Sequence, residues 1–84
     1  MAKGVIRYWA AARSAAGVDE EPYDAETLAQ ALETARAARD MEFSRVIARS
    51  SFLIEGDPVG TRPHDTVTLP EDATVEVLPP FAGG

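Results

Sequence analysis

A single apolar stripe in the middle of the chain limits what the chain can fold into. Its members recur at the spacing of one helix face, and they are Leu28, Ala31, Leu32 and Ala35. The stripe predicts a helix over about residues 25–39, with Asp24 in front of it as the residue that caps the first turn. A helix with one apolar face has to pack that face against another layer. The rest of the sequence must supply that layer.

The segments around this helix have the composition of β-strands and short turns. We expect strands within residues 3–10, 18–23, 51–60 and 74–78, and a helical turn over 10–17 closed by Gly17. Residues 41–50 should form a short second helix or an irregular turn. The first and last strands are the most hydrophobic, so they should be central neighbours in a sheet with the helix across them. Ile6 and Tyr8 should face the core. Pro22 lacks the N–H that a sheet ladder needs, so its strand should lie at an edge.

The length of the chain and the order of these segments indicate the fold class. A chain of 84 residues leaves room for one domain, because typical domains run to roughly 100–150 residues. We therefore predict a single α+β domain over residues 1–84, with a small mixed sheet and one main helix packed across it. Because the last strand should run through the middle of the sheet, residues 79–84 are expected to leave the body as a flexible C-terminal tail.

The composition excludes several classes of site. Without cysteine there is no disulfide, cysteine zinc site or thiol nucleophile, and a single histidine excludes a histidine-rich metal site. The net charge of −6 disfavours nucleic acid and anionic membranes as partners. No apolar run approaches the roughly 20 residues of a membrane span. Residues 1–4 do not resemble a signal peptide, so we expect a cytoplasmic protein.

Conventional catalytic groups are scarce. His64 beside Asp65 could be an oriented base, but a solvated loop histidine is the simpler interpretation. Glu20 and Glu21 are adjacent in a predicted strand, so their side chains point to opposite faces and cannot form a carboxylate pair.

Two further groups of residues have both a functional and a structural interpretation. Four arginines could form a docking patch or simply a solvated face, and they are Arg36, Arg39, Arg45 and Arg49. Tyr8 and Trp9 could offer a ligand platform, but packing in the core or on a sheet face is the simpler interpretation.

The end of the sequence, VLPPFAGG, combines stiff and slim residues in an order that suits chemistry at the C-terminal carboxylate rather than at a side chain. The residues after the last predicted strand are Pro79, Pro80, Phe81, Ala82, Gly83 and Gly84. The two prolines lock their φ angles and form a stiff base, and the segment reaches about 20 Å when extended. The phenylalanine offers one apolar anchor, and the residues after it are slim enough for a narrow tunnel. Such a tail delivers an α-carboxylate.

A carboxylate becomes a good acyl donor only after activation. An ATP-dependent partner can convert it into an acyl-adenylate, whose leaving group is AMP. A sulfur nucleophile then gives a terminal thiocarboxylate, whereas a lysine amine gives an amide. In either case the partner recognises the folded domain, and the tail is the reagent.

Four segments of the chain resemble the MoaD/ThiS family of ubiquitin-like sulfur carriers, most of all the small subunit of molybdopterin synthase. They are VIRYWAAARSAAG, ETLAQALE, EGDPV and LPPFAGG. The doubled proline and the length favour the molybdopterin carriers over the thiamine carriers. Two positions depart from the family pattern. Glu55 stands where the family has the Asn of an Asn-Gly turn, and residues 71–74 lack the Gly-Asp that commonly precedes the last strand.

The resemblance implies a ubiquitin-like β-grasp fold and a carrier that is not an enzyme on its own. Gly84 would be adenylated by a ubiquitin-activating-enzyme-like adenylyltransferase that uses ATP, and a sulfurtransferase would supply the sulfur of its thiocarboxylate. The large subunit of molybdopterin synthase, in a heterotetramer, would bind residues 79–83 as a docking tail. The sulfur would build the molybdopterin dithiolene of the molybdenum cofactor. No metal and no permanently bound cofactor is implied.

Three other functions remain open from the sequence. The chain could carry sulfur for thiamine thiazole or another product, since the tail chemistry would be the same. It could be a ubiquitin-like modifier joined through Gly84 to lysines of other proteins. It could also be an interaction module whose Gly-Gly end has no chemical role.

Overall fold

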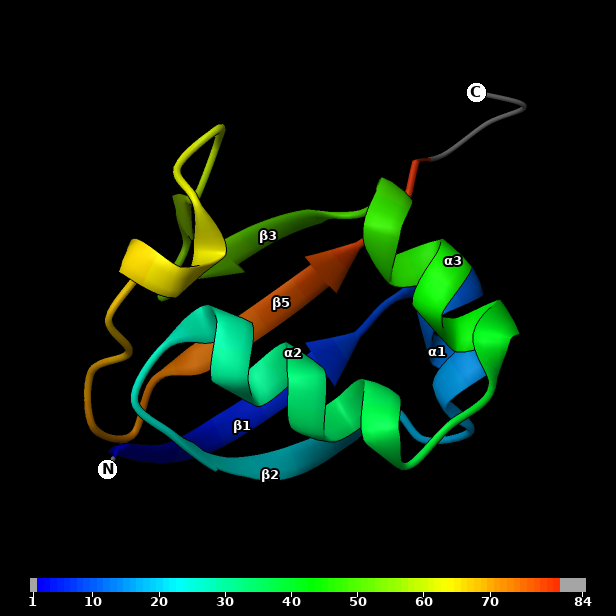
Figure 1. Ribbon diagram of the computed structural model, residues 1–84, viewed down its shortest axis with the longest axis horizontal. Coiled ribbons are helices and arrows are strands. Elements are labelled where there is room, and N and C mark those ends of the chain that lie inside the picture. Colours follow the sequence, from blue (N-terminus) through cyan, green and yellow to red (C-terminus); the bar gives the residue numbers. More distant parts are fainter. Residues whose placement is uncertain (1, 81–84) are drawn as a thin grey trace.

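The architecture is a single mixed sheet with helices over one face (Figure 1). The structure is a computed structural model, and it describes residues 2–80. In chain order the elements are β1 (Ala2–Tyr8), α1 (Ala10–Ala16), β2 (Glu20–Ala25), α2 (Leu28–Ala37), α3 (Met41–Arg49), β3 (Ser51–Ile54), β4 (Asp57–Pro58), the short 3₁₀ helix η1 (His64–Thr66) and β5 (Thr74–Leu78). The predicted α+β class is confirmed.

The strand order places the last strand at the centre of the sheet. The order is β2-β1-β5-β3-β4, with β1 and β5 parallel and the other neighbouring pairs antiparallel. In the parallel pair Ile6 lies opposite Val75 and Tyr8 opposite Val77. This confirms that the two most hydrophobic strands are central neighbours. The strand that contains Pro22 lies at an edge, as predicted.

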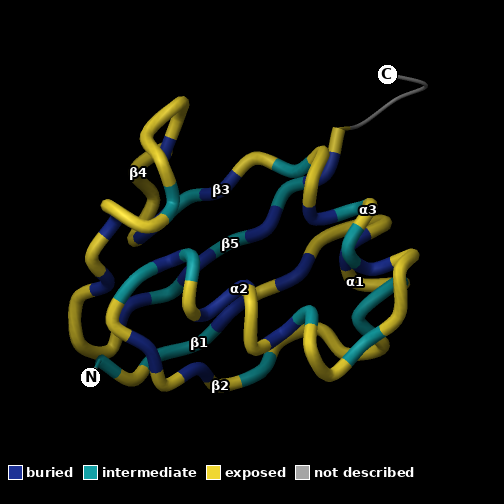
Figure 2. The backbone as a smooth tube through the Cα atoms, viewed as in Figure 1, coloured by how far each residue is buried: buried dark blue, intermediate teal, exposed yellow. Residues whose placement is uncertain are grey.

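The core lies between α2 and the face of the sheet that α2 crosses. The four residues of the apolar stripe are buried, and Leu28 and Leu32 are fully so. Ile6 and Tyr8 are buried on β1, and both inward valines of β5 are completely covered. Figure 2 shows buried segments along the central strands and α2, and the buried residues form one hydrophobic cluster. Each large side chain of this kind contributes roughly 1.5–3 kcal/mol by leaving water.

The start of α2 differs from the prediction. Asp24 does not cap the helix, because β2 stays paired with β1 up to its last residue and holds Asp24 in the extended strand. Thr27 caps the helix instead, and its side chain accepts a hydrogen bond from the Gln30 backbone N–H at 3.2 Å. The prediction failed because the local capping signal was overridden by the longer-range strand pairing.

The two turns that depart from the family pattern contact each other. The β3–β4 hairpin turns at Glu55 and Gly56, with φ angles of 51° and 84°. Positive φ at both positions is what a two-residue type I′ turn requires, and it usually selects Asn or Asp before the Gly. The Glu55 carboxylate accepts a hydrogen bond of 2.7 Å from the Thr74 N–H at the start of β5. Asp72, with φ of 60°, takes the left-handed conformation in the turn just before.

The helices α1 and α3 lie beside the ends of β1 and β5 (Figure 1). α1 ends at Gly17, whose φ of 82° and N–H bond to the Arg13 carbonyl confirm the predicted glycine cap. α3 is capped by Asp40 and buries Phe43 and Ile47, which confirms the second helical segment. Within residues 2–80 no helix is long and apolar enough to cross a membrane.

Candidate functional site at the base of the tail

The described part of the tail begins where β5 leaves the core. Val77 is fully buried, Leu78 is half-buried, Pro79 is buried and Pro80 is exposed. The chain therefore reaches the surface between its two prolines, beyond the end of the central strand (Figure 1). The other predicted site residues, 81–84, lie outside the described residues. Their predicted roles, including that of Gly84, stay predictions, as does the division of the chain into a body and a tail at residue 79.

Trp9 lies directly beside this exit. Its backbone N–H donates a 3.2 Å hydrogen bond to the Val77 carbonyl, and its indole N–H donates one of 3.1 Å to a Glu76 carboxylate oxygen. The Arg7 guanidinium carbon is 5.4 Å from the centre of the Trp9 ring. With 39% of its surface exposed, Trp9 is a large aromatic side chain that the body fixes in place but does not cover. Such a side chain suits contact with a partner.

The C-terminal end of α3 is joined to the strand that lies beside this exit. α3 leads through Ser50 into β3, where Ser51 is paired with Leu78, the last residue of β5. Arg45 and Arg49 are exposed and line a shallow groove on the surface of α3. Neither makes an ion pair with a residue in the described range 2–80. The exit therefore has an exposed indole beside it, and the neighbouring helix α3 carries two exposed arginines.

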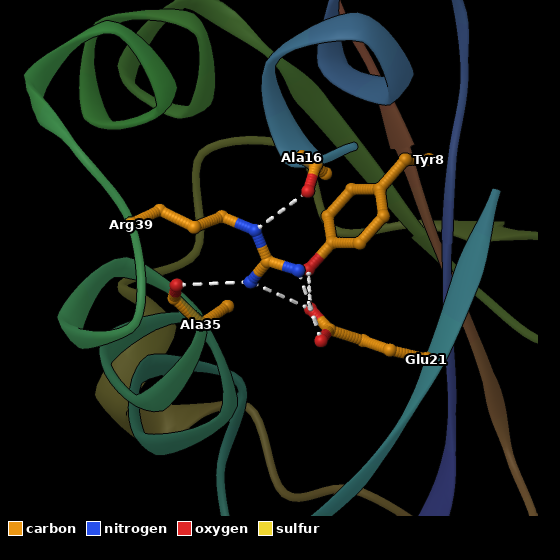
Figure 3. A network of polar contacts seen from close by, with 5 residues as sticks. All are labelled: Tyr8, Ala16, Glu21, Ala35 and Arg39. Atoms are coloured by element: carbon orange, nitrogen blue, oxygen red, sulfur yellow. Dashed lines mark hydrogen bonds and ion pairs between the residues drawn. The ribbon is translucent and has the colours of Figure 1, made fainter. Parts of the chain in front are cut away.

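A polar network around Arg39 holds the surrounding elements together (Figure 3). The Arg39 guanidinium contacts both oxygens of Glu21, at 2.9 and 3.0 Å. It also donates hydrogen bonds to the Ala16 carbonyl at 3.1 Å and the Ala35 carbonyl at 3.0 Å. The Tyr8 hydroxyl donates to Glu21 from the other side. One side chain in the α2–α3 connection therefore joins β1, β2 and the ends of α1 and α2.

The rings of Phe43 and Tyr8 pack against this network on its core side. The Arg39 guanidinium carbon lies 4.8 Å from the centre of the Phe43 ring, and the Phe43 and Tyr8 rings meet edge to face at 5.6 Å. The arginine and glutamate side chains are only 13% and 27% exposed, so the pair is well shielded from solvent. Removing one partner of such a pair leaves an uncompensated charge.

The titration of these groups is explained by the same contacts. Burial, with the nearby Glu21 carboxylate, raises the pKa of Tyr8 far above its ordinary value. Burial alone would raise the pKa of Glu21, but hydrogen bonds from Arg39 and Tyr8 outweigh it and hold that pKa below its usual range. The hydrogen bond to Glu21 raises the pKa of Arg39. The network is thus a fixed pair of charges with a neutral phenol, which is an arrangement for stability rather than proton transfer.

The other candidates from the sequence do not form a site. His64 is half-buried in η1 with its ring edge to face on Phe52 at 5.0 Å, so it is a packing residue rather than a free loop side chain. Glu20 and Glu21 point to opposite faces, as predicted: Glu20 pairs with Arg7 on the open face at 3.8 Å. The four arginines do not form one patch. Arg39 is turned inward, and Arg36 borders a hollow next to η1, away from Arg45 and Arg49.

Comparison with known proteins gives matches in structure. No protein-family model matches the chain, and no curated protein does. The solution structure of small archaeal modifier protein 1 from Methanosarcina acetivorans matches with a TM-score of 0.85 at 22% identity, over 100% of this chain and 98% of that one. A putative molybdopterin converting factor, subunit 1, from Pyrococcus furiosus matches with a TM-score of 0.78 at 23% identity, over 96% and 100%.

A further solved structure agrees with these two. The crystal structure of small archaeal modifier protein 1 from Haloferax volcanii matches with a TM-score of 0.78 at 18% identity, over 98% of this chain and 99% of that one. This chain has the ubiquitin-like β-grasp fold. The predicted fold is confirmed, and the resemblance to the sulfur carriers is supported at the level of the fold. At sequence identities of 18–23%, these structural matches establish the fold but not the function.

Two features of the β-grasp body were missed by the sequence interpretation. The network of Arg39, Glu21 and Tyr8 was not predicted, and the one available signal was that Glu21 had to face opposite to Glu20, toward the helices. The exposure of Trp9 was not predicted either. Its position directly after the last inward residue of β1 is the signal that could have placed it at the end of the sheet.

Proposed function

We propose that this β-grasp protein is a sulfur carrier whose C-terminal Gly84 is activated as an acyl-adenylate and converted to a thiocarboxylate. One observation carries the proposal: the central strand of the sheet ends at a surface exit beside the exposed Trp9. A partner that docks there receives the residues after Pro80. In the sequence these are one phenylalanine and three residues with almost no side chain.

The proposed chemistry belongs to the tail and its partners. An oxygen of the Gly84 carboxylate attacks the α-phosphorus of ATP on the activating enzyme, and pyrophosphate leaves. A persulfide-type sulfur donor then attacks the carbonyl carbon, and AMP leaves with its electron pair. Reductive cleavage of the sulfur–sulfur bond by a thiol releases the thiocarboxylate. The folded body supplies recognition and needs no reactive side chain of its own.

We further propose molybdopterin as the destination of the sulfur. The structural match to a putative molybdopterin converting factor, subunit 1, supports this, together with the LPPFAGG ending. In this proposal the large subunit of molybdopterin synthase binds Pro79, Pro80, Phe81, Ala82 and Gly83 as the docking tail. A ubiquitin-activating-enzyme-like adenylyltransferase and a sulfurtransferase act before it. Delivery to thiamine thiazole or another product would differ only in the partner that accepts the sulfur.

Intact mass spectrometry tests the carrier chemistry directly. The purified 84-residue chain is incubated with an adenylyltransferase of this class from the same source, ATP and a sulfur donor. Exchange of one oxygen for sulfur should raise its mass by about 16 Da. A variant without Gly84 should show no increase, while its circular dichroism and unfolding midpoint stay unchanged. An unchanged mass for the intact chain with active partners would contradict the proposal.

A protein modifier is the second candidate, and the matches to two proteins named small archaeal modifier protein 1 favour it. It shares the activation step, but the acyl group ends on an amine instead of a sulfur. Expression of a tagged chain in its native host, followed by trypsin digestion, distinguishes the two. A modifier leaves tail-derived remnants on lysines of other proteins. A carrier that serves only sulfur transfer leaves none and co-purifies with a large synthase subunit.

A further inference from the structure

The backbone of Trp9 is held on both sides where β1 passes into α1. Its N–H donates to the Val77 carbonyl at 3.2 Å. Its carbonyl accepts from the Ala12 N–H at 2.9 Å and from the Arg13 N–H at 3.3 Å. The backbone is therefore tied to β5 in one direction and to the first turn of α1 in the other. The orientation of the indole is then decided by the contacts of the side chain.

The residue after Trp9 has an unusual backbone conformation. Ala10 has a φ of 48°, in the left-handed region that residues with a Cβ atom enter only at a cost in free energy. Ala10 is exposed, so packing of its methyl group offsets little of that cost. A strained residue of this kind persists only where the surrounding contacts impose it, and such residues cluster at functional sites. The corner between β1 and α1 is therefore held in one conformation by its neighbours.

Two side chains of the sheet contact the indole. Arg7 and Glu76 are direct neighbours in the parallel pair of β1 and β5. Both alternate with buried residues along their strands, so they lie on the face of the sheet opposite to α2 (Figure 1). The indole N–H donates to a Glu76 carboxylate oxygen at 3.1 Å, and the Arg7 guanidinium carbon lies 5.4 Å from the centre of the ring. The indole is therefore held at the face of the sheet opposite to α2.

The Glu76 carboxylate is committed to this contact. Within residues 2–80 the indole N–H is the one hydrogen-bond donor that the Glu76 side chain meets, and Arg7 forms its ion pair with Glu20 instead, at 3.8 Å. Trp9 still has 39% of its surface exposed, so a partner can contact the fixed ring. Ordering a side chain during association costs free energy, and a side chain that is ordered beforehand avoids that cost. The hydrogen bond to Glu76 thus prepares the indole for binding.

We propose that Glu76 is a positioning residue, which fixes the exposed indole of Trp9 in the orientation that the activating partner binds. The inference rests on the proposed function, because it gives the carboxylate a role in docking the carrier on its adenylyltransferase. The indole contacts the partner, and Glu76 acts through the indole. A change at Glu76 should therefore alter binding of the carrier and leave the rate of the bound complex unaltered.

Fluorescence tests the positioning without any partner, because Trp9 is the single tryptophan of the chain. Glu76→Ala removes the acceptor, whereas Glu76→Gln keeps an acceptor oxygen. Both variants remove one negative charge, so their difference isolates the hydrogen bond. In Glu76→Ala the fast component of the anisotropy decay should grow and the indole N–H should exchange faster with water, while Glu76→Gln should stay close to the wild type. Values for Glu76→Ala equal to those of the wild type would overturn the positioning.

Kinetics of activation test the docking role. Exchange of pyrophosphate into ATP, catalysed by the adenylyltransferase from the same source, is measured at increasing carrier concentration. Glu76→Ala should raise the KM for the carrier about five-fold and leave kcat within about two-fold, because only the ordering of the indole is lost. Glu76→Gln should stay within about two-fold of the wild type in both constants. An equal rise of KM in the two variants would assign the effect to charge and overturn the inference.

A double-mutant cycle separates this inference from the proposed function. In a chain that already carries Trp9→Ala, the further change Glu76→Ala should leave KM unaltered, since Glu76 acts through the indole. Additive effects of the two changes, or an unchanged KM in Glu76→Ala alone, overturn the inference while the proposed function stands. A wild-type chain that supports no exchange with an active adenylyltransferase rejects the proposed function and the docking role together. The anisotropy data then still show whether Glu76 holds the indole.

Discussion

Tyr8 and Trp9 are consecutive residues, yet they serve two regions of opposite character. Tyr8 is buried at 2% exposure and belongs to the network around Arg39, where nearly every polar atom is paired. Trp9 is exposed and lies at the exit of the tail, where its indole has open surface. Under the proposed function, stability and recognition belong to separate sides of one strand end. Changes in the first region should alter unfolding, and changes in the second should alter partner binding.

The largest effect should come from Arg39→Ala. It leaves the shielded Glu21 carboxylate without its cation and removes the donor to two helix-end carbonyls, so we expect a loss of about 3 kcal/mol in unfolding free energy. Urea denaturation measures this loss. Arg45→Ala, which removes an exposed arginine of α3, should change stability by less than about 0.5 kcal/mol. A small effect of Arg39→Ala would remove the distinction between the two regions.

The next largest effect should come from Gly4→Ala. A methyl group there would collide with the Ala73 carbonyl oxygen and lie 2.6 Å from the Tyr23 hydroxyl oxygen. Backbone has to move to admit it, so we expect a loss of about 2 kcal/mol. Thermal unfolding provides the measurement. Gly17→Ala is an informative companion: no atom blocks its methyl group, and only its positive φ opposes the change.

Tyr8→Phe should have an intermediate effect that depends on pH. The pKa of Tyr8 is raised in the folded state, so its contribution is complete below the unfolded value of about 10 and is lost as pH rises beyond it. We expect the variant to lose about 1 kcal/mol at neutral pH through the missing hydrogen bond. Its stability should then fall less steeply than that of the wild type in alkaline solution. Parallel curves for the two proteins would contradict this account.

Trp9→Ala should have only a small effect on stability, although it removes the largest side chain in the molecule. Because the indole is partly exposed and held by a surface contact to Glu76, we expect a loss of at most about 1 kcal/mol. Binding to the activating enzyme should weaken instead, as is common for an aromatic anchor, by about 2 kcal/mol or near thirty-fold. Calorimetric titration of folded variant and wild type compares the two quantities.

The sequence predicted the body of the fold because its signals are local and repeated. The α2 stripe and the alternation of Val75 and Val77 defined the two layers, and Pro22 identified an edge strand. The start of α2 could not be predicted from Asp24, because pairing between β1 and β2 decides where the chain stops being extended. Arg39 could not be predicted as an inward residue, because its partners lie on elements distant in sequence. The tail motif was recognised from the sequence, but the structure describes this segment only as far as Pro80.

The hydrogen bond between Glu55 and Thr74 has a consequence for anyone who grafts loops between β-grasp proteins. The hairpin tip and the start of β5 are coupled, because the Glu55 side chain at the tip accepts the Thr74 N–H. A chimera that imports an Asn-Gly tip alone would leave the Thr74 amide without its carboxylate. The β3–β4 turn and the turn before β5 should therefore be exchanged together in such chimeras.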